Sequence, residues 1–240
     1  MQLGIGISTY VETTNPMGSG EFGAVEITAD GGAIVRTGSS PHGQGHETAW
    51  SQIVADQLGV GFDDIEVLHG DTQIAPKGLD TYGSRSLVVG GEALVLAADK
   101  VIDKAKKIAA HQLEANEDDL EFAGGSFTVK GSPDRTMPLA AIAFEAFTAH
   151  NLPDGVEPTL SADATVDPED FSYPHGTHLA AMEVDTETGK VRIRKYVCVD
   201  DVGNQINPMI VEGQVHGGVA QGIGQALYEG VEYDADGNML

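Results

Sequence analysis

Hydrophobic positions along this chain follow two different periods, which predicts a mixture of strands and helices. Short apolar runs between turn residues predict strands at residues 24–27, 33–37, 65–68, 177–184 and 191–199, and a hairpin over residues 120–130. Apolar residues spaced three or four apart predict helices at residues 47–58, 88–113, 138–147 and 208–228. The pattern therefore predicts that both strands and helices contribute to the fold.

The longest and the last predicted helices each carry a continuous stripe of apolar or small residues, the face that a helix normally buries. In the longest helix the stripe consists of Val88, Gly91, Val95, Ala98, Ile102, Ala105, Ala109 and Leu113. In the last helix it consists of Val211, Val215, Gly218, Gly222 and Ala226. Asn207 suits the N-cap of the last helix, Pro208 suits its first turn, and Gly59 suits the end of the first helix.

Two stretches of the chain share one plan. Residues 24–59 and residues 181–227 each read as a hairpin, then a glycine-rich loop, then a helix. This repeat predicts two related lobes, each presenting a helix N-terminus, where free N–H groups and the helix dipole attract anions. Residues 148–175 contain four prolines and little periodicity, so we expect a long segment that joins the lobes or wraps the surface.

Composition narrows the class of partner. The 240 residues are 41% hydrophobic, enough for a core, and the net charge of −24 argues against nucleic acid and anionic membranes as partners. No apolar run is long enough to span a bilayer, so membrane insertion is not expected. Cys198 is the only cysteine, which excludes an internal disulfide. We therefore expect a soluble, cytoplasmic chain.

A first candidate site lies in the loop before the first helix. Gly43 and Gly45 allow a ligand to approach the backbone, and Gln44 between them offers an amide. A dinucleotide-binding glycine turn is the rival interpretation, but Thr48 stands at its third glycine position. His42 and His46 have a spacing seen in metal sites, yet no third ligand lies nearby, so metal ligation is the weaker interpretation.

A second candidate, Thr81–Ser86, precedes the longest helix. Arg85 lies in a Gly/Ser loop at a positive dipole end, which favours an anionic ligand such as phosphate. An N-cap serine followed by a surface arginine explains the same residues equally well.

A third candidate spans Val199–Gly218 and is rich in amide groups. Asp200, Asn204, Asn207 and Gln214 could hydrogen-bond a base, a ribose or an amide-rich ligand. Capping and turn chemistry explain Asn207 and Asp200 as well, but not Gln214 inside the helix.

Three further residues are better explained by structure. Cys198 suits a small core position, and His175 and His178 suit structural roles.

Together these segments resemble the large subunit of the molybdenum hydroxylases, the xanthine dehydrogenase and aldehyde oxidase family, with particular likeness to its carbon monoxide dehydrogenase branch. The matching stretches follow the family's order and cover nearly the whole chain, at residues 43–60, 70–86, 119–131, 151–158 and 206–227. The resemblance implies an α+β fold of mixed sheet with packed helices. It also implies two related molybdopterin-binding lobes, residues 1–160 and residues 161–240, the second truncated at its C-terminal end.

The resemblance also implies roles for single residues around molybdopterin cytosine dinucleotide, the molybdenum cofactor of bacterial members. Gln44 would hydrogen-bond near an oxygen on molybdenum, and Gly45 and His46 would line the pterin. The dinucleotide phosphates would be held by Tyr82, Gly83, Ser84, Arg85 and Ser86. Its phosphate and cytosine end would lie near Asp200, Asn204, Asn207 and Gln214.

For the parent enzyme, the resemblance implies oxidation of carbon monoxide, an aldehyde or an N-heterocycle with water as the oxygen source. Copper would join molybdenum in the carbon monoxide branch. Flavoprotein and iron–sulfur subunits would be the partners, in a homo-oligomer of the complex. The family's substrate loop and its catalytic glutamate fall outside the matching stretches, so no catalytic residue is assigned, and we expect a fragment that is inactive alone. A nucleotide-binding module without molybdenum chemistry and an inactive structural fragment remain the alternatives.

Overall fold

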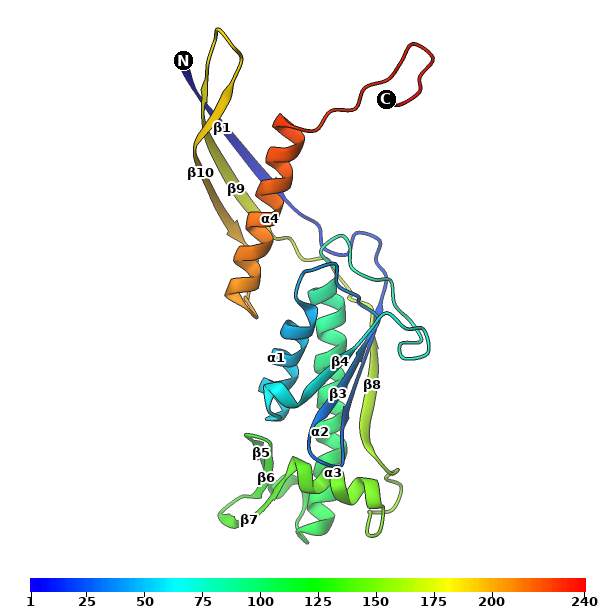
Figure 1. Cartoon of the computed structure of the whole chain (residues 1–240). Coiled ribbons are helices and arrows are strands. Elements are labelled where there is room, and N and C mark those ends of the chain that lie inside the picture. The colour runs from blue at the N-terminus through cyan, green and yellow to red at the C-terminus, as the bar shows by residue number, and fades with distance from the viewer.

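The computed structural model describes residues 1–240 and has an elongated shape with two units (Figure 1). The core unit consists of residues 21–166 and contains the hydrophobic core. The outer unit consists of the first strand, the last two strands and the last helix. Two segments without helix or strand, residues 12–20 and 167–174, connect the units.

A four-stranded sheet forms the centre of the core unit. Its strands are β2 (Glu21–Ile27), β3 (Ala33–Thr37), β4 (Ile65–Leu68) and β8 (Leu160–Val166), in the order β4-β3-β2-β8. Helix α1 (His46–Leu58) connects β3 to β4, which run parallel, while the other pairs are antiparallel. The predicted hairpin, first helix and buried strand are confirmed, and Gly59 ends α1 with φ 69°.

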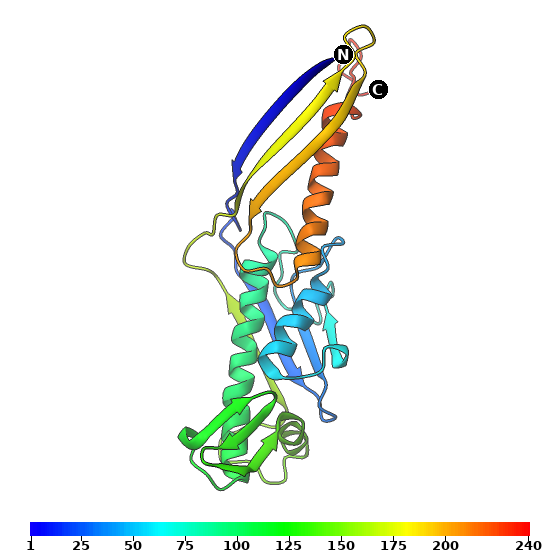
Figure 2. The same cartoon turned by 90° about the vertical axis from the view of Figure 1, so that its left-hand side faces the viewer.

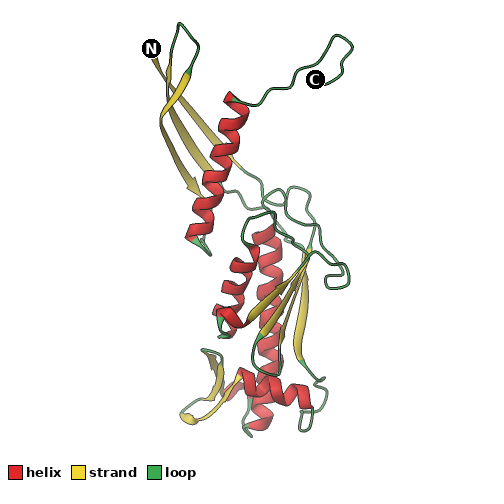
Figure 3. Cartoon of the chain, in the orientation of Figure 1, coloured by secondary structure: helices red, strands yellow, loops and turns green.

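The longest helix packs against this sheet beside α1 (Figures 1 and 3). It begins with one π-helical turn, Ser86–Gly91, and continues as α2 (Glu92–Gln112). Its buried face includes Leu94, Ala97 and Val101. The predicted stripe is therefore partly wrong, because Val95 is exposed.

A small sheet closes the far end of the core unit. Strands β5 (Leu120–Ala123) and β6 (Ser126–Val129) form the predicted hairpin. Strand β7 (Ser132–Pro138), which the sequence analysis missed, extends this sheet and leads into α3 (Leu139–Thr148).

The outer unit is a three-stranded antiparallel sheet with a helix beside it (Figure 2). Its strands are β1 (Gln2–Val11), β9 (His175–Val184) and β10 (Val191–Asp201), in the order β1-β9-β10, and its helix is α4 (Pro208–Leu227). Asn207 caps α4 as predicted, because its Oδ1 accepts a hydrogen bond from the Ile210 N–H at 3.2 Å. The predicted packing stripe of α4 is not realised, because none of its residues is buried.

The predicted division at residue 160 does not follow the sheets. β1 lies in the first predicted lobe but pairs with β9, and β8 lies almost wholly in the second but pairs with β2. The hairpin–loop–helix repeat does appear in both units, as β2-β3-α1 and as β9-β10-α4. None of the helices combines the length and the apolar character needed to cross a membrane.

Candidate functional site

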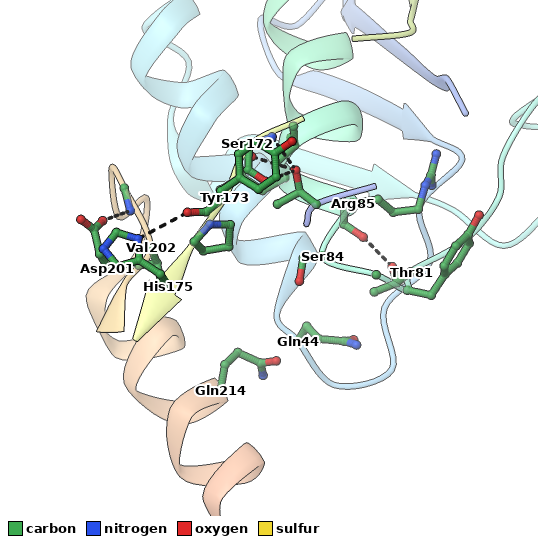
Figure 4. A pocket seen from close by; sticks show the side chains of 18 of the residues that line it. Gln44, Thr81, Ser84, Arg85, Ser172, Tyr173, His175, Asp201, Val202 and Gln214 are labelled. Carbon is green, nitrogen blue, oxygen red and sulfur yellow. Dashed lines mark hydrogen bonds between the residues drawn. The ribbon is translucent and has the colours of Figure 1, made fainter. Parts of the chain in front are cut away.

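A cavity of about 740 Å³ lies between the two units, beside the connecting segments (Figure 4). The core unit contributes Gln44, His46 and residues 81–88 to its wall. The outer unit and the connecting segment contribute residues 172–175, residues 201–203 and Gln214. The fold therefore brings predicted site residues from three distant segments of the chain around one space.

The start of the long helix supplies unpaired hydrogen-bond donors to this cavity. The backbone N–H groups of Ser86, Leu87 and Val88 donate to no other group in the chain, whereas the Val89 N–H donates to the Arg85 carbonyl at 2.9 Å. All three residues line the cavity. Free N–H groups at a helix start, aligned with the helix dipole, are a general means of holding an anion.

Acidic side chains are almost absent from the cavity wall. The chain has 37 aspartates and glutamates, yet Asp201 is the only one that lines the cavity. Serine, threonine and amide side chains make up much of the remaining wall, together with His46 and His175. An anionic ligand would therefore meet little charge repulsion here, despite the net charge of −24.

Arg85 does not present a free charge to the cavity, which corrects the sequence interpretation of this side chain. Its guanidinium is fully buried and forms an ion pair with Glu21, with an Nη1–Oε2 distance of 2.5 Å. It also donates to the backbone carbonyls of Ser19, Gly20 and Asp80. These acceptors engage both terminal nitrogens of the guanidinium, and only its buried Nε has no partner. The side chain therefore holds the loop that precedes the free N–H groups.

The neighbouring loop residues shape the wall. Tyr82 is partly exposed, and the Arg85 guanidinium lies 5.6 Å from its ring centroid. The Gly83 carbonyl accepts from the Asn15 N–H at 2.8 Å, which fixes the loop against the connecting segment. Ser84 has φ 53°, a left-handed backbone conformation that is uncommon outside glycine.

The side-chain amide of Gln44 has one hydrogen-bonded atom and one unpaired donor. Its Oε1 accepts a hydrogen bond from the His42 N–H, while its Nε2 donates to nothing in the chain. Gly43 and Gly45 on either side have φ values of 104° and 76°, so the turn needs glycine at both positions. The turn thus holds the Gln44 amide with its donor unpaired, at the edge of the cavity shown in Figure 4.

His46 is buried and linked to the start of the long helix. Its Nε2 lies 2.9 Å from Thr81 Oγ1, which in turn lies 2.9 Å from Ser86 Oγ. Burial lowers the pKa of His46 below its usual value, which favours a neutral imidazole. His42 is exposed and lies near Asp80, and no cluster of three or more potential metal ligands exists in the chain.

A second, smaller cavity of about 180 Å³ separates the starts of α1 and α4. It is lined by Gln44 and His46 on one side and by Asn204 and Asn207 on the other. The two helices approach closely, since a Cβ atom on Gly45 would lie 3.0 Å from Ile210 Cδ1. Asn204 and Asn207 therefore lie near Gln44. The resemblance instead implies different ends of the cofactor for them, the metal for Gln44 and the phosphate and cytosine end for the two asparagines.

Asp200, in contrast, lies outside both cavities. Its Oδ1 accepts a hydrogen bond from Tyr10 Oη at 2.9 Å and lies 3.1 Å from His178 Nε2. Burial and this hydrogen bond raise the pKa of Tyr10 to about 12. Asp200 therefore connects the three strands of the outer sheet, while its neighbour Asp201 faces the larger cavity.

Sequence reasoning missed several lining residues: Thr14, Ser172, Tyr173, His175 and Asp201. The first two lie on the connecting segments and hydrogen-bond each other, with an Oγ1–Oγ distance of 2.8 Å. No periodicity marks these segments, so only the pairing of β1 with β9 brings them together.

Comparison with known proteins identifies the family. The sequence profile of the molybdopterin cofactor-binding domain matches residues 1–240. The carbon monoxide dehydrogenase large chain of Hydrogenophaga pseudoflava is 43% identical over 248 residues, covering 99% of this chain and 31% of that protein. The gamma subunit of the 6-hydroxypseudooxynicotine dehydrogenase complex of Paenarthrobacter nicotinovorans is 40% identical, covering 100% of this chain and 30% of that subunit.

A solved structure gives the same result. The crystal structure of a Cu,Mo-CO dehydrogenase matches with a TM-score of 0.91 and 39% identity, covering 99% of this chain and 31% of that chain. The chain thus spans about a third of the length of these relatives. The profile matches the whole chain, and the sequence identities and the shared fold agree with it. The chain therefore belongs to the molybdopterin cofactor-binding domains of molybdenum hydroxylase large subunits.

Proposed function

We propose that the cavity between the two units holds the dinucleotide form of the cofactor, molybdopterin cytosine dinucleotide, with its pyrophosphate at the start of the long helix. The observation that carries this proposal is the set of unpaired N–H groups of Ser86, Leu87 and Val88 on a wall that is nearly free of carboxylates. A volume of about 740 Å³ suits a ligand of this size.

The other donors suggest how the ligand lies. The free Nε2 of Gln44 would donate to an oxygen on the metal, and His46 would line the pterin. Gly45 lines neither cavity, and its positive φ shapes the turn between these two residues. The hydroxyl groups of Ser84 and Ser86 would join the three N–H groups around the phosphates. Tyr82, Gly83 and the backbone of Arg85 complete this wall, while the Arg85 side chain acts from behind it.

The amides of the outer unit would complete the site. Gln214 extends from α4 toward the larger cavity (Figure 4), and the side-chain amides of Gln214 and Asn204 form no hydrogen bond within the chain. Because each amide offers both donors and acceptors, these side chains suit hydrogen bonding to a ring of the cofactor that lies against α4. Asn207 is already engaged as a cap, so its contribution is to place α4.

The parent protein is proposed to be an oxidoreductase that oxidises carbon monoxide, an aldehyde or an N-heterocycle with water as the oxygen source. The bound molybdenum centre supplies the redox chemistry, and the residues described above bind and orient the cofactor. Flavoprotein and iron–sulfur subunits are the proposed partners, in a homo-oligomer of the complex in the cytoplasm. The identities of 43% to a carbon monoxide dehydrogenase large chain and of 40% to the gamma subunit of a dehydrogenase complex support this assignment.

If the parent enzyme oxidises carbon monoxide, we expect its copper ion to be bound by ligands outside this chain. Cys198 is the only thiol, and it lies on β10, away from both cavities. The cavity wall therefore offers no thiolate, the ligand that Cu(I) prefers.

The phosphate assignment can be tested on the full 240-residue chain with cytidine diphosphate as the probe. Backbone amide resonances are followed by NMR while the probe is added. We expect the amides of Ser86, Leu87 and Val88 to shift in a saturable manner, because their N–H groups gain an acceptor. The start of α3 is a matched control, since it is also a helix N-terminus but lies at the far end of the core unit. Equal shifts at both helices, or none at residues 86–88, would contradict the proposal.

A further inference from the structure

One side-chain hydrogen bond connects the helices that face each other across the cofactor cavity. Asn207 Nδ2 donates to Gln52 Oε1 at 2.8 Å, and no other side-chain hydrogen bond joins α1 to α4. Gln52 lies on α1, in the core unit, and Asn207 caps α4, in the outer unit. Both hydrogen-bonding groups belong to the chain itself, so the hydrogen bond does not require a bound ligand.

The helix cap fixes the direction of this hydrogen bond. The Asn207 Oδ1 accepts from the Ile210 N–H, so the Nδ2 of the same amide must face Gln52 as a donor. Gln52 must then present its oxygen. The pair therefore has a defined polarity, in which Gln52 is the acceptor.

The position of α4 relative to α1 determines the spacing of the cavity walls. Gln44 stands just before α1, while Asn204 stands just before α4 and Gln214 lies within it. The contacts between the helices are otherwise small: Ile210 lies against Gly45, and a cavity of about 180 Å³ lies between the starts of the two helices. A shift of α4 would therefore move the amides of the outer unit away from Gln44.

We propose that Gln52 is a positioning residue for the cofactor: through Asn207 it holds α4 against α1 and so sets the spacing between the two walls of the site. The consequence for the cofactor rests on the proposed function, but the spacing itself is a property of the chain alone. A test without cofactor therefore separates failure of this inference from failure of the proposed function.

The spacing can be measured between two spin labels in the full chain without cofactor. Asp56→Cys on α1 and Gln221→Cys on α4 provide exposed label positions, in a Cys198→Ser background. Removing the acceptor with Gln52→Leu is expected to lengthen and broaden the distance distribution. Gln52→Glu keeps an acceptor oxygen and should retain the narrow distribution. Gln57→Leu is the matched control, because Gln57 is on the same helix but bonds Val95 and Asp99 of α2.

A second set of variants tests the polarity of the pair without removing a side chain. Asn207→Asp keeps the cap, and the Gln52 amide can rotate to donate to the new carboxylate, so the spacing should persist. Combining Asn207→Asp with Gln52→Glu places two carboxylates opposite each other, and the distribution should broaden as it does for Gln52→Leu. Either single substitution broadening as much as the double one would contradict the assigned geometry.

The effect on the site is then measured by cofactor binding in the parent large subunit. One neutral hydrogen bond corresponds to a loss of roughly two- to tenfold in affinity, so Gln52→Leu should raise the cofactor dissociation constant by about that factor, with recovery in Gln52→Glu. An unchanged distance distribution in Gln52→Leu would overturn the inference. A broadened distribution with unchanged cofactor affinity would instead retain the mechanical coupling and remove its role in the site.

Discussion

Glu21 and Arg85 form an ion pair in which both side chains are fully buried. Ser39 Oγ also donates to Glu21 at 3.2 Å, and the Phe22 N–H donates at 3.1 Å, so the carboxylate is well supplied with partners. The pair joins the first residue of β2 to the residue that precedes the π-helical turn. The donors at Ser86, Leu87 and Val88 are therefore held in place by a charge pair that lies behind them.

Substitution of Arg85 is expected to act first on stability. Arg85→Met leaves the Glu21 carboxylate buried and unpaired, which should lower the free energy of unfolding by about 3–5 kcal/mol. Arg36→Met is the matched control, because the Arg36–Glu26 pair on the same sheet is partly exposed and should cost less than about 1 kcal/mol. Urea unfolding measures both. A loss of cofactor from Arg85→Met at unchanged stability would instead support a direct phosphate contact.

His46 predicts a dependence of stability on pH. Burial lowers its pKa in the folded chain, so the unfolded chain takes up a proton first as the pH falls through about 6.5. The contribution of His46 to stability is therefore fully present above that pH and decreases from there down to the lowered pKa. His46→Gln should remove this part of the pH dependence in urea unfolding between pH 7.5 and pH 5. Identical slopes in the two proteins would contradict a buried neutral histidine.

The two glycines around Gln44 allow a paired test of the contact between the units. Both have positive φ, so an alanine strains the backbone at either position by about 1 kcal/mol. Only at Gly45 would the new Cβ meet Ile210, at 3.0 Å, whereas at Gly43 it meets nothing within 4 Å. Gly45→Ala should therefore lower molybdenum content more than Gly43→Ala at similar stability. Equal losses of molybdenum in the two variants would mean that backbone strain alone causes the loss, without a contribution from the contact with Ile210.

Gln44 should matter for the metal centre and not for folding. Gln44→Ala in the parent subunit is expected to lower turnover per bound molybdenum by about 10–100-fold, a common loss when a hydrogen bond next to a metal is removed. The free energy of unfolding should change by only about 0.5 kcal/mol. Gln225→Ala, on the exposed part of α4, should leave both quantities unchanged. Wild-type turnover per molybdenum in Gln44→Ala would remove this residue from the site.

Most helices and strands could be predicted because residues within each element, such as its capping residues and its apolar spacing, indicate it without reference to distant parts of the chain. Glycine ends α1 at Gly59, and Asn207 and Pro208 start α4, as the sequence indicates. Strands β3 and β4 have the predicted bounds. The apolar alternation of Leu3, Ile5 and Ile7 is the signal that could have revealed β1, which the sequence analysis missed.

Features that depend on distant pairing could not be read from the sequence. The partner of Arg85 lies 64 residues away on β2, so a charged residue in a polar loop looked like a surface ligand. Asp200 and Asp201 are adjacent, and strand alternation places only Asp201 toward the cavity. The pairing of β1 with β9, which sets the shape of the outer unit, joins residues that are more than 160 positions apart.

The proposed cofactor site lies between the two units, with the phosphates at the start of the long helix. It can be located in the loaded parent subunit by an anomalous difference map collected at the molybdenum edge. We expect one molybdenum peak in the 740 Å³ cavity near the Gln44 amide, with phosphate density within hydrogen-bond distance of the N–H groups of Ser86, Leu87 and Val88. A molybdenum peak outside this cavity, or phosphates that touch none of these three groups, would contradict it.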